Sequence, residues 1–243
     1  MSIFDQFVAS PKAEAEKDVI AGSGYGPLES GAYEAVIDMC YLDVSKNGAY
    51  CLNFVFKTKD GATHKETIYF TNRSGETFYK DKNGNEQNLP GFNTVTSICL
   101  LTVGQELNVV GQDAEEKMVN IWNYDLKKEV PTKKKVLMPL LGQEVTLGIQ
   151  KCIEDKYNKP GETVEKAQID KVFRAADHLT TAEIRKGQSE AEFYTRWVED
   201  NTGKTRNKAK LAGQTPAATP SAGASASPFG SAPVAAKSDN PFG

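Results

Sequence analysis

Apolar and polar residues alternate through the first half of the chain, a pattern that predicts β-strands. Residues 33–41 are rich in Tyr, Val, Ile and Met, and residues 49–57 and 65–71 alternate. The turn signals Asn47-Gly48 and Asp60-Gly61 separate these segments. The first half is therefore predicted to be an antiparallel meander.

Residues 93–103 change to a helical period. Asn93 is expected to cap this helix and Gly104 to end it. A short hairpin is expected before it, around Asn83-Gly84, where Phe78, Tyr79, Lys80 and Lys82 form a small aromatic and basic tip.

The second half returns to strands and closes with a helix. Strands are predicted at residues 117–124, 144–153 and 168–174. A helix is expected from Thr180 or Thr181 to about Asn201, with Gly187 as a weak point. Strands, one short helix and further strands predict a mainly β protein with an OB-fold-like five-stranded Greek-key barrel. Residues 93–103 would be the connector helix, and residues 111–137 an insertion or an extra hairpin.

The end of the chain has a different composition. Residues 212–243 are mostly Ala, Ser, Pro and Gly, a composition too poor in large apolar residues to fold. We expect a flexible leader at 1–30, one domain at 31–203 and a disordered tail at 204–243. The tail ends Pro241-Phe242-Gly243, which we expect to bind a protein partner through the exposed ring.

The composition excludes several classes of protein and of binding site. The sequence has no apolar run long enough for a membrane helix, and its N-terminus does not resemble a signal peptide. The four cysteines are spread out, so we expect buried free thiols in a reducing cytoplasm, the host's if the chain is phage-encoded. No cofactor, metal site or enzymatic activity is expected. A net charge of −3 still allows nucleic-acid binding, which needs only a local basic face.

Strand parity gives the first candidate surface. In residues 49–57 the core set is expected to be Tyr50, Leu52, Phe54 and Phe56, which leaves Lys57 on the other face. In the next strand the exposed face is expected to carry Lys65, Thr67, Tyr69, Thr71 and Arg73. Rings that stack on bases, beside cations that hold phosphates, are typical of sites for single-stranded nucleic acid. An ordinary solvated sheet face is the alternative.

Residues 117–135 give the second candidate surface. Val119 and Ile121 are expected to point one way, and Trp122 and Tyr124 the other. The alternative places Trp122 in a second small core with solvated lysines. Five lysines follow and complete the predicted site, which comprises Lys57, Lys65, Tyr69, Arg73, Trp122, Tyr124, Lys127, Lys128, Lys133, Lys134 and Lys135.

Three segments carry a resemblance to a known family. They are Leu89-Pro90-Gly91-Phe92-Asn93, residues 140–145, and residues 180–184 with Phe193 and Trp197 downstream. From Gly31 to about Gly203 the chain looks like the single-stranded DNA-binding proteins of tailed bacteriophages. The tail is similar to that of the bacterial members, although Asp239 is the one acid near the tip and Gly243 follows Phe242.

The resemblance implies an OB-fold that coats single-stranded DNA during replication, recombination and repair, without a cofactor. Replication or recombination proteins would be recruited through the tail. Two alternatives stay open. One is an adaptor whose barrel is only a scaffold for the tail, and the other is a strand-annealing or recombination-mediator protein.

Overall fold

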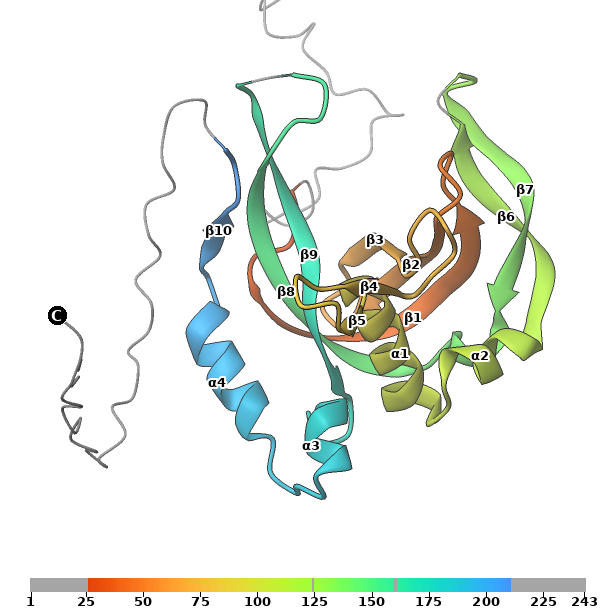
Figure 1. Ribbon diagram of the computed structural model, residues 1–243. Coiled ribbons are helices and arrows are strands. Elements are labelled where there is room, and N and C mark those ends of the chain that lie inside the picture. Colours follow the sequence, from red (N-terminus) through yellow and green to blue (C-terminus); the bar gives the residue numbers. More distant parts are fainter. Residues whose placement is uncertain (1–25, 124, 160, 211–243) are drawn as a thin grey trace, which may run out of the picture. The chain divides into compact units, whose positions relative to one another are not determined.

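The computed structural model describes residues 26–123, 125–159 and 161–210 (Figure 1). Most of the predicted leader, Tyr124 and the predicted partner-binding residues Pro241, Phe242 and Gly243 lie outside these ranges. Within them, no helix has the length and apolar character to cross a membrane.

The described chain is mainly β, as predicted. Eight strands form one sheet, and β4 and β5 form a separate hairpin. The strands are β1 Gly31–Val44, β2 Tyr50–Thr58, β3 Thr63–Tyr69, β4 Phe78–Lys80, β5 Glu86–Asn88, β6 Ala114–Asn123, β7 Lys128–Leu137, β8 Glu144–Asp155, β9 Thr163–Arg174 and β10 Thr205–Asn207. The helices are α1 Pro90–Val103, α2 Leu107–Val110, α3 Thr181–Arg185 and α4 Glu192–Asn201, with 3-10 turns at Gly111–Asp113 and Met138–Leu140.

The long strand β1 organises the sheet. One of its edges pairs with β2 from Ala35 to Val44, with a register shift between Ile37 and Met39. Its other edge pairs first with β8 and then, at Tyr41 and Leu42, with β7. Figure 1 shows the result, in which the β6–β7 and β8–β9 hairpins rise as two arms from β1.

The sheet does not close into the predicted five-stranded barrel, because one seam stays open. Five strands run in the order β3, β2, β1, β8, β9, but no backbone pairing joins β3 to β9 within the described residues. A side chain bridges this seam instead. The Glu66 carboxylate accepts a hydrogen bond from the Ile169 amide at 2.8 Å, and the same oxygen lies 2.8 Å from Nε2 of the buried His64.

The core follows the predicted parity at three of four positions of β2. Leu52, Phe54 and Phe56 are buried, and the last two rings stack with centroids 5.3 Å apart. Tyr50 was expected beside them but is 42% exposed. It is the first residue of the strand, so its ring extends past the edge of the core, near Phe70.

The helix α1 packs on this core and begins earlier than predicted. Val95, Ile98, Cys99 and Leu101 are its buried residues. Asn93 does not cap it, because the helix starts at Pro90, a residue that needs no amide partner at the first helical position. Gly104 ends the helix as predicted, in a left-handed conformation with φ of 70°. All four cysteines are buried and free, as expected.

The single C-terminal helix that the sequence predicts is divided into α3 and α4. Gly187, the predicted weak point, lies between them with φ of 70°. Thr180 and Glu183 form a capping box at the start of α3, and Glu183 also accepts a hydrogen bond from the Phe193 amide. Burial alone would raise the pKa of Glu183, but these hydrogen bonds outweigh it and lower the pKa.

The strand β10 begins inside the stretch assigned to the tail. It pairs in parallel with β8 at Lys151, Cys152 and Ile153. A buried polar cluster fixes it there, in which Gln150 Nε2 donates to Ser30 Oγ at 2.9 Å and to the Lys204 carbonyl at 2.8 Å. The start of β1, the middle of β8 and the segment before β10 are therefore held together.

Close packing at Gly91 provides a test of how α1 is attached to β3. A Cβ atom at this position would lie 1.9 Å from the Tyr69 carbonyl oxygen. We therefore expect Gly91→Ala to lower the free energy of unfolding by about 1–3 kcal/mol, the usual cost of overpacking. Gly111→Ala is the matched control, because Gly111 has φ of −68° and nothing within 4 Å of its added carbon. Denaturant unfolding should separate the two variants, and equal stabilities would contradict this packing.

Candidate nucleic-acid interface

The outer face of β2 and β3 carries the first predicted surface. The register pairs Cys51 with Tyr69 and Asn53 with Thr67, so these four side chains share one face. Tyr69 is 52% exposed, and Lys65 and Thr67 on the same strand are also exposed. The predicted alternation of this strand is therefore present, and it leaves a tyrosine ring open to a ligand.

Two members of the predicted exposed set lie elsewhere. Thr71 is buried, because its hydroxyl accepts a hydrogen bond from the Tyr50 amide at 2.8 Å. Arg73 is exposed but follows the end of β3, in the turn where Asn72 accepts hydrogen bonds from the Ser74 and Glu76 amides. It therefore lies outside the strand ladder that carries Tyr69.

The cations of this surface differ in how they are engaged. Lys57 forms an exposed ion pair with Asp38 at 2.7 Å, at the register shift of β1. Within the described ranges, Lys65 and Arg73 form no salt bridge. Their charge is available to a ligand, and an exposed pair such as that of Lys57 costs little to break.

The β6–β7 arm carries the second predicted surface. Trp122 is 51% exposed, and Met118, four residues away on the same face of β6, is 61% exposed. Val119, on the opposite face, is buried. The alternative in which Trp122 packs in a second small core is therefore wrong. Nothing is described of Tyr124.

The five lysines of this arm do not form one patch. Lys133 is paired with Met118 in the register, so Lys133 and Lys135 share the face of Trp122. Lys128 and Lys134 share the opposite face, with Val119. Lys127 occupies the turn with φ of 49°. The sequence predicted an insertion or an extra hairpin at residues 111–137, and the hairpin is present, but its register, which separates these lysines, was not predicted.

Lys134 has a structural contact. Its Nζ lies 2.7 Å from Asp43 Oδ1 on β1, and its side chain is mostly buried. Lys133 instead forms an ion pair with Glu116 at 3.2 Å, and both side chains are solvent-exposed. Lys134 therefore attaches the arm to β1, whereas Lys133 stays accessible to a ligand.

The register separates the two aromatic surfaces. Where β1 meets β7, Leu42 pairs with Lys135 on the core-side face, and Tyr41 pairs with Val136 on the outer face. Tyr69 belongs to the outer face and Trp122 to the face of Lys135. The residues of the predicted site are therefore divided between two stacking surfaces at this junction.

One exposed ring was missed by sequence analysis. Tyr157 is 98% exposed in the turn between β8 and β9. Lys156 and Lys159 flank it, and both pair with Glu162, at 2.8 and 3.5 Å. A tyrosine between two lysines, just before Pro160-Gly161, is a signal that could have identified this loop.

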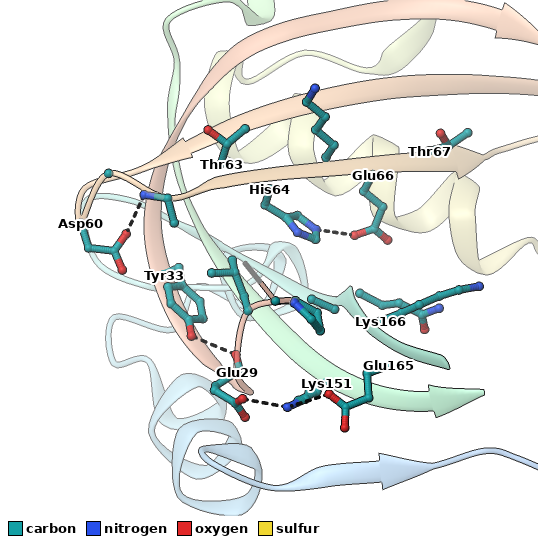
Figure 2. A pocket seen from close by; sticks show the side chains of 18 residues that line it. Glu29, Tyr33, Asp60, Thr63, His64, Glu66, Thr67, Lys151, Glu165 and Lys166 are labelled. Atoms are coloured by element: carbon teal, nitrogen blue, oxygen red, sulfur yellow. Dashed lines mark hydrogen bonds and ion pairs between the residues drawn. The ribbon is translucent and has the colours of Figure 1, made fainter. Parts of the chain in front are cut away.

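A cavity of about 1160 Å³ lies along the seam between β3 and β9 (Figure 2). Its cations are Lys65, Lys151 and Lys166, whereas its acids are Glu29, Asp60, Glu66 and Glu165. Lys151 is already bound by Glu29 at 2.8 Å and Glu165 at 3.1 Å. The excess of carboxylates does not favour a polyanion, so the strand faces are better candidates than the cavity.

The described ranges hold no group of three or more His, Cys, Asp or Glu side chains arranged to bind a metal ion. Comparison of the sequence with protein-family models and with curated proteins found no match. The geometry of the side chains therefore carries the functional argument.

The two adjacent lysines of β7 provide a test with a built-in control. We expect Lys134→Met to lower the free energy of unfolding by about 1–2 kcal/mol, because it leaves the half-buried Asp43 carboxylate without its cation, with the Val44 amide as its remaining hydrogen-bond donor. Lys133→Met should change it by less than about 0.5 kcal/mol, since its pair is exposed. Urea unfolding of both variants is the measurement, and equal losses would show that Lys134 does not anchor the arm.

Proposed function

We propose that this protein binds single-stranded DNA without regard to sequence. The observation that carries the proposal is Tyr69, a half-exposed ring on a strand face beside Lys65, which has no partner within the described residues. Bases of any kind stack on such a ring, and the ammonium group balances a phosphate. On the β6–β7 arm, Trp122 shares its strand face with Lys133 and Lys135, although its cross-strand neighbour is Glu129.

The topology supports an OB-fold assignment. The meander β1–β2–β3, the helix α1 and the pair β8–β9, with β8 returning to β1, follow the order of that partly open barrel. OB-folds bind oligonucleotides on the faces of their second and third strands and through the loops beside them. In this chain the corresponding strand face is that of Tyr69. The corresponding loops are residues 45–49 and the β8–β9 turn with Tyr157.

The charges also fit an extended anionic strand. Besides Lys65 and Arg73, the described parts of the chain show no salt bridge for Lys127, Lys128 or Lys135. The exposed pairs of Lys57 and Lys133 can exchange a carboxylate for a phosphate at small cost. In the family that the sequence resembles, such binding serves phage DNA replication, recombination and repair, and we extend that role to this chain together with partner recruitment by the tail.

The first test is a titration with oligo-dT and with duplex of equal length. We expect tight binding to the single strand, weaker binding to the duplex, and an affinity that falls as salt rises. The slope of log K against log salt should be about −0.7 for each phosphate contacted. Binding that is absent, or independent of salt, would refute the proposal.

Tryptophan fluorescence tests the second surface. The chain has two tryptophans, and Trp197 is buried with its Nε1 donating to Asp170 at 2.8 Å. We therefore expect oligo-dT to quench Trp122, and Trp122→Phe to remove the quenching while stacking on the phenyl ring preserves most of the affinity. Tyr69→Ala should weaken binding by about 1–3 kcal/mol and leave the quenching at saturation intact. Quenching that survives in Trp122→Phe would place the β6–β7 arm outside the binding surface.

A further inference from the structure

A second groove lies on the other side of α1 from the core. It has a volume of about 690 Å³ and is lined by the β4–β5 hairpin, the first turns of α1, β9 and the starts of α3 and α4. None of its lining residues belongs to the two surfaces already described. The groove is therefore separate from the two surfaces to which the proposed function assigns DNA binding.

The groove is fixed relative to Tyr69. Gly91 lies so close to the Tyr69 carbonyl oxygen that no side chain fits between them. Pro90, the neighbour of Gly91, lines the groove. The end of β3 and the rim of the groove are therefore adjacent, and a strand that leaves the ring of Tyr69 in this direction meets the rim next.

An exposed ring stands on that rim. Tyr79 is 49% exposed and is paired with Gln87 across the hairpin, so both side chains share the face that lines the groove. Asn93, Thr94 and Ser97 of α1 also line the groove. The Thr94 hydroxyl donates to the Pro90 carbonyl at 3.1 Å and the Ser97 hydroxyl lies 3.5 Å from that of Thr181, and each oxygen has a further lone pair to accept with. A stacking platform thus faces a row of hydrogen-bonding groups that suit base edges and sugars.

The groove lining carries one lysine and one aspartate, which differ in how they are engaged. Lys171 lines it, forms no salt bridge within the described ranges, and has its Nζ 5.9 Å from the centre of the Phe193 ring. The single carboxylate of the lining, Asp170, is engaged by Trp197 Nε1 at 2.8 Å and by Arg206 at 3.4 Å. The ammonium group is therefore left without a counter-charge, unlike Lys151 and Lys166 of the β3–β9 seam, which both form salt bridges.

We infer that this groove is a second subsite for the same unpaired strand, an inference that rests on the proposed function. Nucleotides that leave the ring of Tyr69 continue past Pro90, a base stacks on Tyr79, and Lys171 holds a phosphate. The subsite lengthens the bound strand without adding sequence readout, because amides and hydroxyls both donate and accept hydrogen bonds.

The length of the oligonucleotide tests the inference. Oligo-dT of about 5 and of about 16 nucleotides spans the range of site sizes for one OB-fold. Tyr79→Ala should weaken binding of the longer strand about tenfold, the effect of losing one stacked base, and leave the shorter one unchanged. Lys171→Gln should reduce the salt slope of the longer strand by about 0.7. Tyr79→Phe is the matched control, because it keeps the ring and should bind both lengths like the wild type.

The outcomes separate this inference from the proposed function. Wild-type protein that binds neither length overturns both. Wild-type protein that binds both lengths, with Tyr79→Ala and Lys171→Gln unchanged on the longer strand, overturns the second subsite alone. Equal losses on both lengths also overturn it, because they would place Tyr79 in the first surface. Thermal melting of each variant checks that the fold is intact, and a photo-crosslink from the longer strand to the β4–β5 hairpin, absent with the shorter one, would support the assignment directly.

Discussion

The structure depends on the saturation of both edges of β1. One edge is filled by β2, and the other is divided between β8 and β7. Because one strand serves all three partners, the meander and both arms share a common frame. The buried cluster of Ser30, Gln150 and Lys204 extends this frame by joining the start of β1 to the segment before β10. Each exposed ring is held in place by backbone pairing that leads to this strand or by α1.

This frame explains why the candidate surfaces lie where they do. Residues that face the core are apolar and close-packed, so rings such as Tyr69 and Trp122 are free for a ligand only on faces or arms that extend away from the core. The cavity at the β3–β9 seam has a larger volume than the groove beside α1, but its carboxylates outnumber its lysines. The strand faces are therefore better candidates for binding a polyanion than the seam cavity, because of their charge and despite the volume of that cavity.

Local patterns in the sequence were enough for the meander, the end of α1 at Gly104 and the break at Gly187, because strand alternation and glycine conformations are set by neighbouring residues. The same parity placed Tyr69 and Trp122 correctly on exposed faces. The open seam was not predictable, since it depends on how far β3 lies from β9. Nor were the separate roles of Lys133 and Lys134, because β7 carries Pro131 and a run of lysines that obscure its alternation.

The bridge made by Glu66 has a mechanical consequence. A closed barrel resists expansion through a ladder of backbone bonds, all of which must break together. Between β3 and β9 of the described chain, the Ile169 amide is instead held by one carboxylate oxygen, which His64 contacts from the same strand as Glu66. Widening at this seam therefore strains a flexible side chain and the packing of α1, which contacts both strands, and breaks no strand pairing.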